Sequence, residues 1–586
     1  MKNKYFELII NYRNTVKKFL LLLVVFNLIS CNENDFLEEK PLDFLSPVNS
    51  FVTFEHYDAA VIGLYTKFRN EFYGSTNALV APRVMMQATD LVFYNHDAGA
   101  NTDFASLLNP NSDFVYNALW GPAYAIIYDA NVIIGRAQSE ENELTEEQKN
   151  KVLAEAYFFR GYMHKMLADL YGGVPIVLQE TVEPKRDYVR ASRDEVYQQS
   201  VTDLLFATEN LSDIESVDDY RISDLVAWQV LSEVYISLKQ WDKAIEAASK
   251  VIDSPATTLM TGRFGTRVND AFNPDMPWAS GGDVYWDLFR KGNQNRSSGN
   301  TEALWVLPYE YNIDGGEPGG VPLEVNFCPR IWQVTIPNSD GTNAKLIPTP
   351  NTYYGGRPGG KCRLTEYFYH TIWDESGYQE DIRNASYNII RDVKVNNPAS
   401  EYNGQWVMAD NVPIPLKTWN DTVRNFFPIP AKAASMGDHP DDLWIADQTV
   451  PGSITSITGP SGKTYRNEYK MRLAETYLLR AEAYLGKGDK SSAADDINVV
   501  RSRANAPDVS SADVDIDYIL DERMRELYVE EFRLLTLTRL GKLVERTKLA
   551  NPVVGNTYGE YQNLWPIPYS EIEKNTGAVL EQNPGY

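Results

Sequence analysis

The sequence predicts a mostly α-helical fold in which antiparallel helix pairs form a scaffold and one long irregular region carries the ligand site. Apolar residues recur at helical spacing through residues 51–254 and again through 466–586. Between 255 and 465, Gly, Pro, Asn and Asp interrupt short segments instead, which is typical of long loops. With 586 residues and 43% hydrophobic content, the chain can bury a large core, and residues 31–586 are expected to form one compact unit.

The first thirty residues have the pattern of an export signal. Residues 19–30 are apolar, about half of the roughly 20 residues that span a bilayer, and Lys17 and Lys18 precede them. Leu28-Ile29-Ser30-Cys31 resembles the lipobox of bacterial lipoproteins. This resemblance implies that residues 1–30 are a signal peptide, that Cys31 is acylated, and that 31–50 form a lipidated tether. The alternative is an ordinary signal peptide with an incidental cysteine.

Charge excludes one class of partner. The formal net charge is −25, and residues 1–30 carry five Lys or Arg and one Glu, so the rest of the chain carries −29. Such an acidic chain is a poor match for nucleic-acid phosphates. Besides Cys31, the chain has two cysteines, Cys328 and Cys362, which either pair or stay separate and buried.

The clearest predicted helix covers residues 152–171. Its apolar residues follow steps of four and three and so lie on one face of a helix, and Gly172, Gly173 and Pro175 end it. His164 lies within this helix, and we interpret it as structural. The apolar face consists of Val152, Ala156, Phe159, Met163, Met166 and Leu170.

Two further helix pairs are related in sequence. In residues 225–252 a tyrosine is followed by an alanine nine positions on and a valine seven positions later, and residues 474–500 repeat these intervals. The motif Ala-Glu-x-Tyr-x-x-Arg also occurs twice, at 154–160 and 474–480. The pattern resembles a tetratricopeptide repeat, in which small residues let two helices approach and neighbouring pairs bury each other's faces.

The helix predicted at residues 516–527 completes the scaffold. Asp521 and Arg525 are four residues apart and are expected on its exposed side, where such a pair contributes a few tenths of a kcal/mol. The expected buried stripe is Ile516, Leu520, Met524 and Leu527.

Three stretches together resemble the SusD/RagB family of Bacteroidota outer-membrane lipoproteins. They are the helix at 152–171 with the following YGGVPIV, the segment ILDERMRELYVEEFRLLTLTRLGKL at 519–543, and the chain end with LWPIPYSEI and EQNPGY. The resemblance implies a surface lid over a SusC-like TonB-dependent transporter. In that role the lipoprotein captures a nutrient, most often an oligosaccharide, and presents it to the barrel without doing chemistry. Asn32, in place of an aspartate after Cys31, is compatible with delivery to the outer membrane.

The sequence offers no pattern for catalysis, a metal or a cofactor. The five histidines are widely spaced, and there is no HExxH, CxxC or GxSxG. The glycine pairs lack the phosphate-binding pattern and are interpreted as turns. A glycosidase needs two carboxylates about 5–9.5 Å apart, and abundant Asp and Glu leave that possibility open. We therefore predict a non-enzymatic protein without cofactors.

A sugar site needs aromatic faces and planar polar side chains. The early loop at 81–104 offers Arg83, Asp90, Tyr94, Asn95 and His96. The irregular region holds eight of the twelve tryptophans, and for each of them the alternative role is core packing. From this region we select Trp278, Tyr285, Trp286, Arg290, Trp332, Tyr353 and Tyr354 as ligand candidates. Core positions are expected for Trp120, Tyr124, Trp228 and Trp241.

Several functions remain open beside glycan capture. The same architecture could take peptides or another nutrient, could act only as a helical-repeat scaffold that docks proteins, or could hydrolyse its ligand. The sequence does not identify the glycan. Net acidity disfavours sulfated or uronate-rich polymers, but the basic residues Arg357, Lys361 and Arg363 could reverse that preference.

Overall fold

The computed structural model describes Tyr12 and residues 51–74, 82–94, 104–139, 142–273, 275–316, 319–418, 421–446, 450–456 and 460–586. Apart from Tyr12, the predicted signal peptide, Cys31 and the tether lie outside these residues. Within the described part, no helix combines the length and apolarity needed to cross a bilayer.

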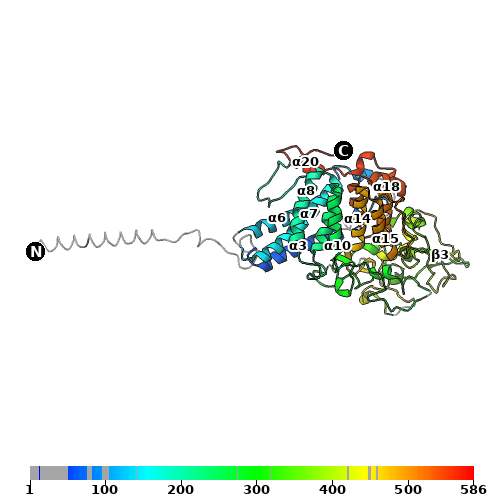
Figure 1. Cartoon of the computed structure of the whole chain (residues 1–586). Helices are drawn as coiled ribbons and strands as arrows, with labels where there is room; N and C mark the ends of the chain where they lie inside the picture. Colours follow the sequence, from blue (N-terminus) through cyan, green and yellow to red (C-terminus); the bar gives the residue numbers. More distant parts are fainter. Residues whose placement is uncertain are drawn as a thin grey trace, which may run out of the picture.

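Paired helices fill one side of the molecule (Figure 1). Neighbours in sequence pack on each other, α6 on α7, α7 on α8, α8 on α9 and α9 on α10, while α3 lies against α6 and α7. This arrangement confirms the predicted mostly α fold with tetratricopeptide-like pairs. The bounds are α3 Phe54–Tyr73, α6 Gly121–Gln138, α7 Glu146–Tyr171, α8 Arg193–Asn210, α9 Asp224–Ser237 and α10 Trp241–Ile252.

The last helix pair joins the first ones although the irregular region separates them in sequence. Helix α14 (Leu473–Lys487) packs on α10 and on α15 (Lys490–Arg503), and α16 (Ile516–Leu527) packs on α14. The chain between α10 and α14 thus leaves the helical stack and returns to it (Figure 1). The remaining larger helices are α17 Arg533–Arg539, α18 Leu543–Ala550 and α20 Tyr569–Lys574.

The repeated motif has a structural counterpart in two salt bridges. Arg160 of α7 binds Asp203 of α8 through two hydrogen bonds of 2.9 and 2.7 Å. Arg480 of α14 binds Asp496 of α15 in the same way, at 2.8 and 2.7 Å. In both pairs the guanidinium also lies over the motif tyrosine. The motif therefore marks equivalent positions at which two antiparallel helices are held together.

Strands are short and form two-stranded antiparallel ribbons. Strand β2 (Ala303–Leu307) pairs with β8 (Glu468–Arg472) and brings Trp305 into the helical core, where its ring stacks 5.1 Å from Phe68. The other ribbons are β1 (Val92–Tyr94) with β5 (Cys362–Leu364), β3 (Thr335–Pro337) with β4 (Asn343–Lys345), and β6 (Ile389–Ile390) with β7 (Ile429–Pro430).

Short helices connect the ribbons and the larger helices. The α-helical ones are α4 Phe104–Leu107, α5 Asp113–Val115, α11 Val284–Leu288, α12 Leu323–Phe327, α13 Ile372–Asp374 and α19 Pro552–Gly555. The 3₁₀ and π turns include η1 Pro82–Met85, η2 Tyr116–Trp120, η4 Ile331–Gln333, η5 Thr352–Tyr354 and η8 Asp421–Asn425.

The chain end packs across the end of α7. Trp565 is fully buried beside Phe114 and Tyr171, and its backbone N–H donates to the Leu170 carbonyl at 2.9 Å. Asn583 donates its amide to the carbonyls of Tyr171 and Trp565. The C-terminal segment that contains Trp565 and Asn583 therefore fastens to the end of α7 and has a structural role.

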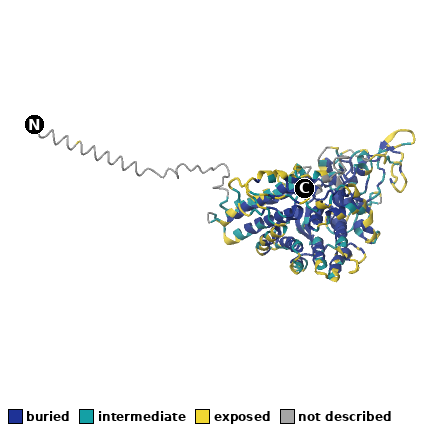
Figure 2. Cartoon of the chain, turned by 90° about the horizontal axis from the view of Figure 1, so that it is seen from above, coloured by how far each residue is buried: buried dark blue, intermediate teal, exposed yellow. Residues whose placement is uncertain are grey.

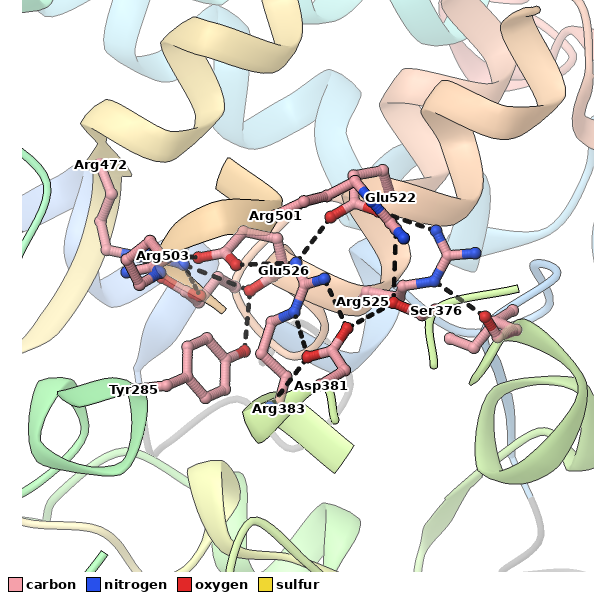
Figure 3. A network of polar contacts seen from close by, with 12 residues as sticks. Tyr285, Ser376, Asp381, Arg383, Arg472, Arg501, Arg503, Glu522, Arg525 and Glu526 are labelled. Carbon is pink, nitrogen blue, oxygen red and sulfur yellow. Dashed lines mark hydrogen bonds and ion pairs between the residues drawn. The ribbon is translucent and has the colours of Figure 1, made fainter. Parts of the chain in front are cut away.

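A buried ionic network joins the irregular region to the C-terminal helices (Figure 3). Glu522 binds Arg383, Arg501 and Arg525 at 2.7–2.9 Å, and all four side chains are essentially inaccessible to solvent. Glu526, one turn later, binds Arg472 at 3.0 Å and also pairs with Arg503. Figure 2 shows that buried residues lie mainly in the interior of the described chain and exposed residues mainly at its outer edges.

This network corrects one sequence expectation. Asp521 and Arg525 were expected on the exposed side of the helix, but both are buried. Arg525 binds Glu522 and the Ile372 carbonyl, and Asp521 pairs with Arg546. Helix α16 is covered on both sides because the irregular region packs over it.

Neither described cysteine forms a disulfide. Cys328 and Cys362 are fully buried, which settles the open question of their pairing. Burial raises the pKa of the Cys328 thiol. A buried neutral thiol of this kind is a packing residue.

Candidate functional site

An aromatic cluster in the irregular region brings together three of the predicted ligand residues. The Trp278 indole N–H donates to the Tyr353 carbonyl at 2.7 Å, and its ring meets Tyr354 edge-on at 5.6 Å. Trp278 and Tyr354 are buried, whereas Tyr353 is half-buried. The two buried rings thus form a rigid base, and Tyr353 reaches the surface above it.

Two further tryptophans extend this cluster at the surface. Trp406 packs edge-on against Trp278 at 5.9 Å, and Trp444 packs edge-on against Tyr353 at 6.3 Å. Both are half-buried. Lys394 lies 5.2 Å from the centre of the Trp406 ring, which places a cation beside the aromatic surface. The sequence marked these tryptophans as part of the aromatic-rich region but did not single them out.

Residues 351–360 connect the cluster to Trp332. The Trp332 indole N–H donates to the Pro358 carbonyl at 3.3 Å, and the Arg357 guanidinium lies 5.0 Å from the ring centre. Trp332 is half-buried. The same short segment therefore presents Tyr353 at one end and supports Trp332 at the other.

A buried polar cluster holds this segment from below. His439 Nε2 lies 2.9 Å from the Glu324 carboxylate, and its Nδ1 shares a hydrogen bond of 2.8 Å with the Thr352 hydroxyl. Gly356 sits directly on the pair with φ of +63°, and a Cβ there would overlap Glu324. The cluster fixes the backbone that carries Tyr353, so the aromatic surface is preformed.

Three other predicted ligand residues lie in the interior. Tyr285 is fully buried and donates to the Glu526 carbonyl at 2.9 Å. Trp286 and Arg290 are also buried, with the guanidinium 4.5 Å from the centre of the ring. Burial lowers the pKa of Arg290 to about 9. In this structure these side chains support the core and present no face to a ligand.

The candidates predicted in the early loop at 81–104 do not share one environment. Asp90 is fully buried, and Arg533 and Arg546 bind its carboxylate at 2.7–3.1 Å. Asp90 therefore has a scaffold role here. Arg83 and Tyr94 lie in η1 and β1, and the ribbon of β1 with β5 places the Tyr94 backbone opposite Cys362. Asn95 and His96 lie outside the described residues.

Two cavities lie away from the predicted residues. One, of about 300 Å³, is lined by aromatic residues of α6 and η2, among them Trp120, Tyr124 and Tyr128. Trp120 is buried as expected, but Tyr124 is only half-buried and faces this cavity. The other, of about 820 Å³, is rich in carboxylates such as Asp508, Asp513 and Asp515. Within the described part of the chain, no three His, Cys, Asp or Glu side chains form a metal-binding group.

The arrangement is better suited to binding a ring-shaped polar ligand than to catalysing a reaction. Half-buried aromatics offer flat faces, and two cations lie beside them, Arg357 and Lys394, of which Lys394 is paired with Asp275. His439, which lies beneath this surface, is occupied by Glu324 and Thr352. His164, which is also buried, bonds the Arg160 carbonyl, and burial lowers its pKa to about 4, as expected for a structural residue.

Comparison with known families gives two matches that together cover most of the chain. The sequence profile of the SusD family matches residues 337–586. A second profile, described as "Starch-binding associating with outer membrane", matches residues 35–236.

Individual relatives agree with these profiles. SusD-like protein P2 of Formosa agariphila is 23% identical over 97% of this chain and 99% of its own. Starch-binding protein SusD of Bacteroides thetaiotaomicron is 37% identical over 20% of this chain and 21% of its own.

Solved structures show the same fold. A laminarin-binding SusD-like protein superposes with a TM-score of 0.63 at 20% identity, covering 92% of this chain and all of the other. Surface glycan-binding protein A of Bacteroides thetaiotaomicron, solved with laminarihexaose, gives a TM-score of 0.60 at 18% identity, covering 91% of this chain and all of the other.

Proposed function

Because the chain belongs to the SusD family, we propose that it is a surface lipoprotein that binds an oligosaccharide and delivers it to a SusC-like TonB-dependent transporter. One observation carries the binding part of this proposal. Four half-buried aromatic side chains lie on or beside the segment 351–360, which the buried residues Trp278, Tyr354, Glu324 and His439 hold in place, and a sugar-binding surface needs such faces. They are Trp332, Tyr353, Trp406 and Trp444.

The relatives support this choice of ligand class. The names of two similar structures specify laminarin and laminarihexaose as their ligands, and a matching relative is named a starch-binding protein. We therefore propose that the present chain takes a glycan as well, by stacking and hydrogen bonding, without breaking a bond. The exact sugar is a separate question, since identity to these structures is 20% or less.

A glycan panel tests the binding role. The purified chain should bind at least one oligosaccharide class, and replacement of Tyr353 and Trp332 by Ala should weaken that binding at least tenfold, because each loses a stacking face. Trp241→Ala, in the half-buried start of α10, is the matched control and should leave binding unchanged. Binding to a peptide library but to no glycan would instead support capture of peptides.

The family and the lipobox support anchoring to the membrane and delivery to a transporter. We propose that Cys31 carries the lipid that ties the protein to the outer membrane. Cys31→Ser should abolish incorporation of labelled palmitate and shift the protein from the membrane to the soluble fraction. Co-purification with a TonB-dependent barrel from intact membranes tests the partner, and failure to recover any barrel would count against delivery.

A further inference from the structure

Five cationic side chains come from the chain next to Trp332 and from neighbouring segments, in contrast to the net acidity of the chain. All five are partly accessible to solvent. They come from the segment before η4, from residues 357–363 and from η8, which lie against one another. The five are Arg330, Arg357, Lys361, Arg363 and Arg424. The formal net charge of the chain is −25, so this basic patch runs against the overall charge and calls for a specific explanation.

Arg357 lies over the Trp332 ring. Its guanidinium carbon lies 5.0 Å from the centre of the Trp332 ring, and the Trp332 indole N–H is held by the Pro358 carbonyl. A guanidinium that stacks on an aromatic face is ordered and keeps its edge free to donate in a plane. Planar donation of this kind fits carboxylate and sulfate oxygens.

Two more arginines, Arg330 and Arg424, lie on backbone segments that are hydrogen-bonded to each other. The Arg330 backbone N–H donates to the Arg424 carbonyl at 2.8 Å, and the Arg424 side chain donates to the carbonyls of Gly359 and Gly360 at 2.8 and 3.2 Å. Burial lowers the pKa of Arg330, and the like charge of Arg424 lowers it further. Repulsion between two cations is relieved when an anion binds between them.

Among the described residues, no carboxylate forms an ion pair with Arg330 or Arg357. Glu366 pairs with Arg363 at its edge and lies 3.4 Å from His370. Asp421 accepts hydrogen bonds from Thr418 and Asn425. Arg330 reaches only the Asn425 amide oxygen, at 3.1 Å, and among the described residues neither Arg330 nor Arg357 forms an ion pair.

We propose that the Trp332 surface selects acidic oligosaccharides, whose carboxylate or sulfate groups bind Arg330 and Arg357 while a sugar ring lies against the indole. This inference rests on the proposed glycan-binding function and narrows it to a charge class. A polymer presents its charges at intervals along the chain, and an open surface with separate guanidinium groups suits it better than a closed pocket. Net acidity elsewhere leaves the patch as the place where such a polymer can approach.

Matched ligands test the proposal on the unaltered protein. The full chain, purified in detergent, is titrated with a uronate oligosaccharide and with the same oligosaccharide after reduction of its carboxyl groups to alcohols. A sulfated oligosaccharide and its desulfated form make the second pair. We expect at least one acidic form to bind about tenfold or more tightly than its neutral counterpart, as two charge-assisted hydrogen bonds would provide. The preferred pair distinguishes carboxylate from sulfate.

Variants locate the effect. R330Q and R357Q together should remove the preference for the acidic form while the neutral form binds as before. R186Q is the matched control because Arg186 is exposed and lies in the connection between α7 and α8, away from the patch. Raising the salt from 50 to 500 mM should weaken only the acidic form, since the Debye length shortens from above 10 Å to below about 5 Å.

The outcomes distinguish a failure of charge selection from a failure of glycan binding itself. Equal binding of acidic and neutral forms overturns the charge selection and leaves glycan binding intact. An acidic preference that survives R330Q and R357Q overturns the assigned location. Competition by an oligoglutamate peptide as effective as the acidic glycan overturns the ligand class. Absence of binding to any glycan in a broad panel overturns the proposed function and this inference together.

Discussion

Trp278 and Trp332 are the same residue type in the same irregular region, but their surroundings differ. Trp278 is 1% exposed and contacts Tyr354 and Trp406, whereas Trp332 is half-buried at the surface. Burial of an indole in a packed cluster stabilises the fold, and a partly exposed indole is available to a ligand. Residue type alone could not separate these roles, because the covering segments come from distant parts of the chain.

Replacing each tryptophan by Ala should therefore give different results. Trp278→Ala should lower the free energy of unfolding by about 3–5 kcal/mol, because a cavity remains where the indole was. Trp332→Ala should cost about 1 kcal/mol or less and weaken glycan binding. Urea unfolding and glycan titration of both variants provide the comparison. Equal stability losses in the two variants would contradict the assignment.

At the residue scale, the lowered pKa of Glu522 predicts how stability depends on pH. Burial alone would raise its pKa, but the guanidinium groups of Arg383, Arg525 and Arg501 outweigh burial and hold the pKa well below its usual range. The folded state then binds the proton more weakly than the unfolded chain does. Stability from this group is present above pH 4.5, the ordinary value, and is lost as the pH falls below it.

Glu522→Gln should remove this pH dependence and also destabilise the fold at pH 7. Loss of one partner leaves buried arginines without their carboxylate, at a cost of about 3–5 kcal/mol. Chemical unfolding at pH 3, 4, 5 and 7 should show the difference between wild type and variant shrinking toward low pH. Glu545→Gln, at an exposed position of α18, is the control. A difference that is constant with pH would contradict the prediction.

At the scale of elements, helices were predictable and strands were not. The helical spacing in residues 152–171 is a local property, and α7 contains that range. Strand β1 pairs with β5, which follows far along the chain, and each has only three residues. Such short strands have no period to detect. The side-chain placement in α16 was wrong for a related reason, since the segment that covers its charged face is remote in sequence.

The repeated salt bridges give a prediction for helix pairs. Arg160 is the more buried arginine, and it also donates to Asn131 and to the Leu178 carbonyl, whereas Arg480 has Ser249 as a further partner. Double-mutant cycles should give coupling energies of about 1–3 kcal/mol for both bridges, larger for Arg160 with Asp203. Alanine replacements followed by thermal unfolding measure them. Additive effects at either site would show that the bridge does not join its helices.

At the scale of the molecule, the site depends on how the irregular region between α10 and α14 packs back against the helices. Helix α14 packs on α10, so the chain must close the helical stack around residues 253–472. The sequence located the aromatic-rich region, and with it Trp332 and Tyr353. It could not tell these from Tyr285 and Trp286, because only the closed structure determines which rings the core covers.

The network of Figure 3 predicts that both parts unfold together. Asp381 and Arg383 belong to the irregular region, Glu522 and Glu526 to α16, and no bulk water separates them because their side chains are buried. Eight of the twelve tryptophans lie in residues 255–465, and only Trp305 among those described is placed here in the helical core, so tryptophan fluorescence reports mainly on the irregular region, whereas far-UV circular dichroism reports mainly on the helical stack. Urea transitions followed by the two signals should therefore coincide. In Glu522→Gln the fluorescence transition should move to lower urea than the helical one, because the irregular region loses its main ionic link to α16. Separate transitions already in the wild type would show that the irregular region is an independent folding unit and that the network does not couple it to the helices.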